Sequence, residues 1–150
     1  MLLSKSCVYG LRASLFLAAD NSGEYVSIKG MSEKLGISFH FLTKILQQLT
    51  ADGIMESYKG PKGGVRLSKP AKDITFLEIV VSIDGEDLLR ECVLGLPGCG
   101  SDKPCPLHDS WFETRTKIKE MFESTTLEYL AIEGKNNNLR ISEDGKFDWI

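Results

Sequence analysis

Three of the chain's four cysteines lie in one short stretch, residues 91–109, with the sequence ECVLGLPGCGSDKPCPLHD. Six residues separate Cys92 from Cys99, five separate Cys99 from Cys105, and His108 follows Cys105 after two more. Thiolates and imidazole nitrogens are side-chain ligands that zinc and iron–sulfur clusters prefer. The stretch is therefore a candidate metal centre with up to four ligands.

The residues between these cysteines favour neither a helix nor a strand. Six of them are turn formers: Gly95, Pro97, Gly98, Gly100, Pro104 and Pro106. A loop of this composition has few apolar side chains to hold its shape, and buried structural cysteines are not typical of it. The composition therefore indicates that a bound group holds the loop in shape.

The spacing favours an iron–sulfur cluster over a single ion. Zinc sites usually pair ligands about two to four residues apart, and here only Cys105 and His108 are that close. A cluster is wider than one ion and suits the longer gaps. A zinc site and free or redox-active thiols are the alternatives. His108 is either the fourth ligand or a surface residue at the start of a helix capped by Asp109 or Ser110.

Composition and charge limit the class of protein. The 150 residues, 42% of them hydrophobic, suit one domain or a small domain with an added oligomerisation element. Residues 1–74 hold ten Lys/Arg against six Asp/Glu, and residues 75–150 hold eight against fifteen, so nucleic-acid contact is expected through the first half only. No apolar run is long enough to cross a membrane and no signal-peptide core is evident, so we expect a cytoplasmic protein with reduced thiols.

Apolar periodicity predicts three helices in the basic half. The first covers residues 4–19. Ser27 can cap a short helix that ends near Leu35, and Ser38 can cap another that continues to about Ala51. Two helices joined by so short a glycine turn indicate a helix-turn-helix.

The helix that follows Ser38 carries the residues that we expect to reach DNA. Its apolar side chains recur on one face. Five polar residues lie largely off that face: Ser38, His40, Thr43, Lys44 and Gln47. Such residues can contact base edges and phosphates in a major groove. The alternative is an ordinary solvated helix face.

A basic hairpin follows this helix. Residues 54–59 and 65–68 are predicted strands on either side of the turn GPKGG at 60–64. Four basic residues lie on or beside it: Lys59, Lys62, Arg66 and Lys69. These cations can contact phosphates or a minor groove. A hairpin in this place is a wing, so residues 1–74 are predicted to form a winged helix-turn-helix DNA-binding domain.

The acidic half begins with a capping box, Thr75 with Glu78, ahead of a short apolar helix that ends at residues 84–85. Residues 75–108 thus hold this helix and the cysteine-rich loop.

Residues 109–133 are predicted as one long helix. Its apolar seam runs through six residues: Trp111, Ile118, Phe122, Thr125, Tyr129 and Ile132. We expect a dimerisation helix, with packing inside its own subunit as the alternative. Residues 134–150 are predicted to form a loose polar tail. The expected fold is mostly α with a small β-hairpin wing.

These segments together resemble the Rrf2 family of bacterial transcription regulators, and most closely its iron–sulfur members. The resemblance rests on LSKSCVYGLRA near the amino terminus, FLTKIL at 41–46, KGPKGGVRL at 59–67 and the cysteine loop. It covers about residues 1–133. It implies a homodimeric winged-helix repressor or activator of operator DNA. It also implies a cluster, held by three cysteines and a fourth ligand, that reports iron–sulfur status, oxidants or nitric oxide.

The resemblance also assigns ligands. Three residues match the family's cysteine ligands: Cys92, Cys99 and Cys105. His108 matches the histidine of the two-iron members, and Val8 stands where four-iron members can have an aspartate ligand. A [2Fe–2S] cluster is therefore favoured, with [4Fe–4S] as the alternative.

The sequence departs from the family pattern in two places. The first cysteine gap is one residue longer than is common, which bears on cluster type and ligation. Thr43-Lys44 stands where relatives often have Glu-Gln, which indicates a different operator sequence.

Other functions are compatible with these residues. One is a zinc- or thiol-based winged-helix regulator without a cluster, and another is an iron–sulfur electron-transfer protein, against which the basic wing argues. We find no nucleotide loop or nucleophile–base pair, so neither an enzyme nor a small-molecule substrate is expected. Cys7 is expected in the core or at a subunit contact, or as a ligand for a partner chain's cluster.

Overall fold

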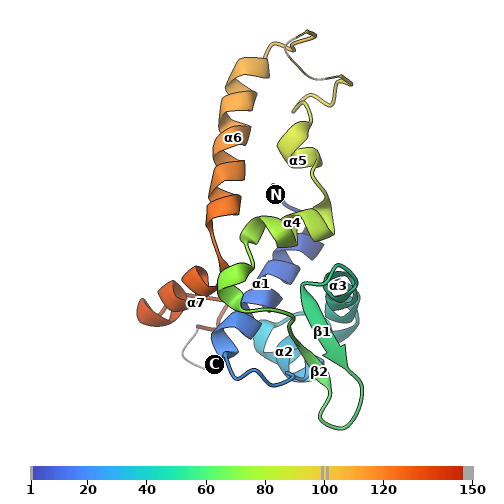
Figure 1. The fold of residues 1–150 in the computed structure, drawn as a ribbon, viewed down its shortest axis with the longest axis vertical. Coiled ribbons are helices and arrows are strands. Elements are labelled where there is room, and N and C mark those ends of the chain that lie inside the picture. The colour runs from blue at the N-terminus through green and yellow to red at the C-terminus, as the bar shows by residue number, and fades with distance from the viewer. Residues whose placement is uncertain (1, 99, 101, 147–150) are drawn as a thin grey trace.

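The computed structural model describes residues 2–98, 100 and 102–146, so Cys99 lies outside the described residues. A helical head (residues 5–84 and 127–136) carries the wing at one end (Figure 1). An arm extends from the other end and consists of the helices at 87–90 and 108–124 with the cysteine loop between them. The elements are α1 (Lys5–Asp20), α2 (Ile28–Leu35), α3 (Phe39–Ala51), β1 (Met55–Tyr58), β2 (Gly64–Leu67), η1 (Ala71–Asp73), α4 (Phe76–Asp84), α5 (Asp87–Arg90), α6 (His108–Ser124) and α7 (Leu127–Asn136). The expected fold class, mostly α with a β-hairpin wing, is confirmed; η1 and α5 were not predicted.

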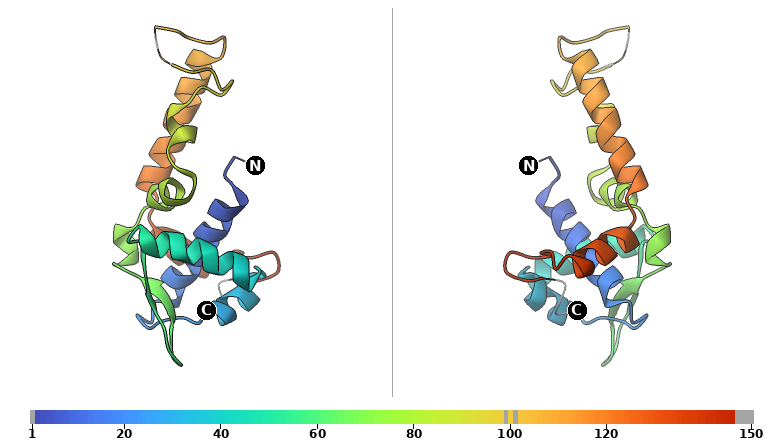
Figure 2. Two further views of the ribbon diagram at one scale, coloured as in Figure 1. Left: turned by 90° about the vertical axis from the view of Figure 1, so that its right-hand side faces the viewer. Right: turned by 90° about the vertical axis from the view of Figure 1, so that its left-hand side faces the viewer.

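The helix-turn-helix forms where the serines and the glycine predicted it. The Ser27 hydroxyl accepts a hydrogen bond from the Gly30 N–H, and the Ser38 hydroxyl accepts one from the Phe41 N–H, so each serine caps its helix. Gly36 ends α2 with φ 67°, in the left-handed region that glycine adopts without strain. α3 then crosses the head close to α1 and α2 (Figure 2). Its apolar face is buried in the core: Leu42, Ile45, Leu46 and Leu49.

The wing is an antiparallel hairpin that is attached to the start of α2. Met55 pairs with Leu67 and Tyr58 with Gly64. The buried Val65 also exchanges two backbone hydrogen bonds with Val26, of 2.8 and 3.0 Å, so the segment before α2 continues the pairing. At Gly64 a Cβ atom would lie 1.9 Å from the Val26 carbonyl oxygen, so only glycine permits this close approach.

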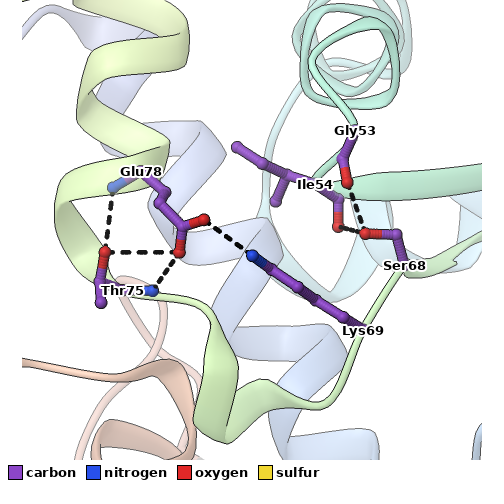
Figure 3. Close-up of polar contacts among 6 residues, drawn as sticks. All are labelled: Gly53, Ile54, Ser68, Lys69, Thr75 and Glu78. Atoms are coloured by element: carbon purple, nitrogen blue, oxygen red, sulfur yellow. Dashed lines mark hydrogen bonds and ion pairs between the residues drawn. The ribbon is translucent and has the colours of Figure 1, made fainter.

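A polar junction joins the wing to α4 (Figure 3). The predicted capping box is present: the Thr75 hydroxyl accepts from the Glu78 N–H, and the Glu78 carboxylate accepts from the Thr75 N–H at 2.7 Å. The same carboxylate pairs with Lys69 Nζ at 2.9 Å. Burial opposes ionisation of Glu78, yet the hydrogen bonds from Lys69 and Thr75 hold its pKa below the ordinary value. Ser68 donates to the Gly53 and Ile54 carbonyls and closes the base of the wing.

The prediction of one helix over residues 109–133 is wrong. α6 ends at Ser124 and α7 begins at Leu127. The backbone between them is extended because it pairs with the segment before α4: the Thr125 carbonyl accepts from the Phe76 N–H, and the Leu127 N–H donates to the Ile74 carbonyl. α7 then packs on α1, and Tyr129 and Ile132 do not continue the α6 seam.

The prediction of a loose tail from residue 134 is also wrong for the residues that the structure describes. α7 continues to Asn136, and the ammonium group of Lys135 donates a hydrogen bond to the carbonyl of Ala19 at the end of α1. Ile141 is buried, and its N–H donates to the Gly145 carbonyl in a tight turn. One apolar side chain in a polar stretch is thus enough to dock it against the head.

Cys7 should make the stability of the fold depend on pH. It is completely buried, and burial together with the charge of Asp84 raises its pKa from 9.0 to about 12. Above pH 9.0 the unfolded chain therefore loses this proton while the folded chain keeps it, so stability falls as pH rises toward the folded pKa. Cys7 contributes at most about 1.4 kcal/mol per pH unit to this loss. Urea unfolding of the wild type and Cys7→Ala should show a shallower alkaline decline in the variant. Equal slopes would contradict the assignment.

Candidate DNA-binding face and cysteine loop

Three of the five predicted contact residues lie within α3 and are exposed to solvent, and the ring of one of them, His40, contacts the Phe39 ring. His40, Lys44 and Gln47 are exposed. The other two are engaged within the helix, because Ser38 caps α3 and the Thr43 hydroxyl donates to the Phe39 carbonyl at 2.7 Å. The polar face of α3 is therefore exposed to solvent, and its contact with DNA stays a prediction.

An open groove of about 680 Å³ lies between α3, the wing and the start of α2. It brings together predicted contact residues from two elements, Thr43 and Gln47 from α3 and Lys59 from the wing. Two exposed aromatic residues that the sequence analysis missed also line it, Phe39 and Tyr58. The signal that could have found them was their place in the sequence, since Phe39 directly follows the Ser38 cap and Tyr58 directly precedes Lys59.

Arg66 lies apart from this groove, on a surface lined by Glu56 and Gly23. Its guanidinium pairs with Glu56 at 3.0 Å, donates to the Gly23 carbonyl at 3.2 Å, and lies 4.3 Å from the Tyr25 ring centre. The hydrogen bond to Glu56 raises the pKa of Arg66. These contacts fix the hairpin to the loop before α2, so the structure assigns Arg66 a structural role that the sequence did not predict.

Lys59 and Lys62 remain as the cations near the tip of the wing. Both are exposed, and neither forms an ion pair with a described residue. Lys69, by contrast, is bound to Glu78. The charge that the wing can offer to a phosphate therefore comes from Lys59 and Lys62.

The cysteine loop leaves α5 and returns to α6 at the far end of the arm (Figure 2). It brings the sulfurs of Cys92 and Cys105 to 3.4 Å, and neither forms a disulfide with a described residue. Cys92 is 5% exposed, and its sulfur accepts a hydrogen bond from the Leu94 N–H at 3.4 Å. Cys99, the third predicted ligand, lies outside the described residues.

Both ends of the loop are attached to α6. Trp111 Nε1 and an Arg115 guanidinium nitrogen donate to the same Glu91 carbonyl, at 2.9 and 3.1 Å. At the other end, the His108 N–H donates to the Cys105 carbonyl at 3.0 Å. The two donors to Glu91 lie one helical turn apart, and their common acceptor immediately precedes Cys92. The backbone positions of Cys92 and Cys105 are thus both fixed relative to α6.

His108 is not grouped with the two sulfurs. It is the first residue of α6, and its ring stacks on Phe112 with centroids 6.2 Å apart. Within the described residues, no three His, Cys, Asp or Glu side chains form a group that could hold a metal ion. Of the three predicted ligands that the structure describes, Cys92, Cys105 and His108, it therefore brings together the two cysteines.

The Cys92–Cys105 pair nevertheless fits a metal centre. Two thiolates bound tetrahedrally to one ion at about 2.3 Å lie about 3.8 Å apart, close to the 3.4 Å between these sulfurs. The donor atoms are soft and are partly removed from water, which suits zinc and iron–sulfur chemistry. A cluster or zinc ion is compatible with the two residues that the structure describes.

The arm has large apolar side chains that its own chain does not cover. Six are between 46% and 56% exposed: Val93, Leu94, Leu96, Leu107, Phe112 and Met121. Exposed apolar side chains at this density are typical of surfaces that associate with a partner. In the described part of the chain, no helix is both long and apolar enough to span a bilayer.

Known proteins share both the sequence and this architecture. The family model of Rrf2, described as an iron-dependent transcriptional regulator, matches residues 3–133. The HTH-type transcriptional regulator IscR of Photorhabdus laumondii is 29% identical over 131 residues, which are 87% of this chain and 79% of the relative. Protein aau3 of Rhizobium meliloti is 37% identical over 111 residues, 73% of this chain and 68% of that protein.

Solved structures agree with these matches. The global cysteine regulator CymR of B. subtilis superposes with a TM-score of 0.73 at 26% identity, over 87% of this chain and 95% of CymR. The structure of T. potens IscR gives a TM-score of 0.71 at 24% identity, over 92% of each chain. Since the family model spans both the winged head and the arm, this chain belongs to the Rrf2 family of transcriptional regulators.

Proposed function

We propose that this chain binds operator DNA as a cytoplasmic homodimer and that an iron–sulfur cluster on the cysteine loop controls its affinity. The proposed ligands are Cys92, Cys99, Cys105 and His108, with [2Fe–2S] favoured over [4Fe–4S]. The observation that carries the proposal is the approach of the Cys92 and Cys105 sulfurs to 3.4 Å in a loop with both ends fixed to α6. A turn-rich loop that is not needed for the core is well suited to a ligand-dependent role.

The DNA contacts follow from the exposed side chains. α3 would lie in the major groove, with His40, Lys44 and Gln47 toward the bases and phosphates. Lys59 and Lys62 on the wing would neutralise backbone phosphates. Ser38 and Thr43 are engaged within α3, so we propose that they contact DNA only at the edge of the interface. Arg66 supports the shape of the wing.

The dimer would form through the arm. The apolar residues Phe112 and Met121 are about half exposed. Full burial of such a side chain contributes about 1.5–3 kcal/mol, so covering its exposed half would contribute about half of that. A dimer would set two winged heads at a fixed separation, and a two-fold operator has half-sites about one helical turn apart. A small change in the arms would then alter both sets of DNA contacts together.

Trp111 and Arg115 connect the start of the cysteine loop to α6. When bound, the cluster would supply a redox- and nitric-oxide-sensitive bridge between the loop's cysteines. Because both side chains bind the carbonyl before Cys92, a displacement of that cysteine would move α6 as well. The proposed signal path from cysteine to DNA thus consists of Glu91, α6 and the head.

A zinc- or thiol-based regulator is the second candidate function. It is favoured by the close Cys92–Cys105 pair, which could bind zinc or undergo thiol chemistry. The similarity to CymR, the global cysteine regulator of B. subtilis, also supports it. An electron-transfer role has less support, because it gives no function to the exposed lysines of the wing.

Visible absorption tests the cluster. Protein purified without oxygen should show iron–sulfur absorption bands and near-stoichiometric iron and sulfide. Cys99→Ala should lose both, whereas Cys7→Ala, changed at a buried site in α1, should keep them. A colourless wild type that takes up no iron or sulfide on reconstitution would overturn the cluster, and bound zinc would favour the second candidate.

Salt dependence tests the wing. Lys62→Ala should weaken binding to specific and random DNA alike, and the slope of log affinity against log salt should fall by about one unit. Lys72→Ala is a matched control, since Lys72 is also exposed but lies in η1, outside the wing. Binding measured by fluorescence anisotropy at several salt concentrations gives the slopes. An unchanged slope for Lys62→Ala would show that the wing does not contact phosphate.

Sedimentation tests the arm. Phe112 and Met121 are nine residues apart and so lie on opposite flanks of α6. A double variant, Phe112→Glu with Met121→Glu, therefore places a negative charge on both flanks of α6. Whichever flank faces the partner, dimerisation should weaken by at least about tenfold. Leu139→Glu changes an exposed apolar residue outside the arm and should remain dimeric. A double variant as dimeric as the wild type would place the interface elsewhere.

A further inference from the structure

We infer that Cys92 and Cys105 form a reversible disulfide with each other when the metal-free chain meets a low-molecular-weight disulfide such as oxidised glutathione. This inference rests on the thiol-based candidate function and specifies its chemistry, and it requires neither a cluster nor zinc. It assigns the loop a second chemical state, in which a covalent bond links its entry to its exit.

The geometry places the two sulfurs close to bonding distance. A disulfide bond is about 2.05 Å long, so sulfurs at 3.4 Å must approach by only about 1.4 Å. Cys92 follows the Glu91 carbonyl, which Trp111 and Arg115 hold. The fold has therefore already brought together residues that lie far apart in the sequence, and such proximity favours an intramolecular step over a second encounter in solution.

The difference in exposure sets the order of the reaction. Cys105 is half-buried, whereas Cys92 is 5% exposed. The Cys105 sulfur loses its proton and attacks one sulfur of glutathione disulfide, forming a mixed disulfide and releasing the first glutathione. The Cys92 sulfur then loses its proton and attacks the Cys105 sulfur, releasing the second glutathione. The chain gives up two protons and two electrons, and one glutathione disulfide becomes two glutathione thiols.

Cys7 does not replace either sulfur of this pair. Cys7 is completely buried in α1, in a separate part of the fold from the loop. Cys99 lies outside the described residues, so it must be tested directly. A Cys92–Cys105 bond would remove two of the proposed metal ligands at once, so metal loading and disulfide formation should exclude each other.

The experiment uses the full chain, freed of metal with a chelator and reduced without oxygen. It is incubated with rising proportions of glutathione disulfide, quenched in acid and alkylated. Cleavage before Asp102 separates Cys105 from Cys92 and Cys99. We expect a linked peptide pair lighter by two hydrogen atoms than the two reduced peptides together. Cys99→Ser should retain this linked pair and Cys105→Ser should lose it, with circular dichroism to verify that both variants fold.

The result separates this inference from the cluster proposal. In Cys99→Ser, Cys105 that stays fully alkylatable at every glutathione ratio would overturn the inference, as would wild-type Cys105 linked only to Cys99. A wild type that binds a cluster but forms no disulfide after metal removal would overturn the inference alone. A disulfide in a chain that never binds a cluster would support the inference and refute the cluster proposal.

Discussion

Burial of α1 is the constraint on which the rest of the structure depends. α2, α3, α4, α7 and β2 all contact it. Its inward side chains include Ala13 and Phe16, and burial of a side chain as large as Phe16 contributes about 1.5–3 kcal/mol. At its start, the Ser4 N–H donates to the Asp84 carboxylate at 2.8 Å, which ties α1 to the end of α4. The orientation of α4, and with it the base of the arm, is therefore set by α1.

Sequence reasoning succeeded for features that depend on neighbouring residues. Ser27, Ser38 and the Thr75–Glu78 box each satisfy backbone groups within three residues, so their helix starts could be predicted. The break after Ser124 could not be predicted in this way. Backbone groups about fifty residues earlier in the chain, on either side of Thr75, form hydrogen bonds with the backbone at the break and so compete with helical hydrogen bonds there. Helical periodicity continues through the break and gives no sign of it.

The candidate site shows the same division. Cysteine spacing predicted a shared centre, and the two described cysteines do converge. Trp111 was assigned to an apolar seam because helical periodicity shows only where large apolar side chains recur. It does not show that the indole N–H of Trp111 donates to the Glu91 carbonyl. Arg66 was assigned to DNA because its charge is visible in the sequence, whereas its contacts with Glu56 and Tyr25 come from two other segments.

α6 also determines how the two ends of the arm face each other. Trp111 is directed toward the Glu91 carbonyl at one end, and Phe122 packs on the Phe76 ring, 4.8 Å away, at the other. They are eleven residues apart, which is about three turns of an α-helix. One added or deleted residue would rotate one contact by about 100° relative to the other. The length of this segment is therefore restricted to whole turns, even where its exposed side chains are free to vary.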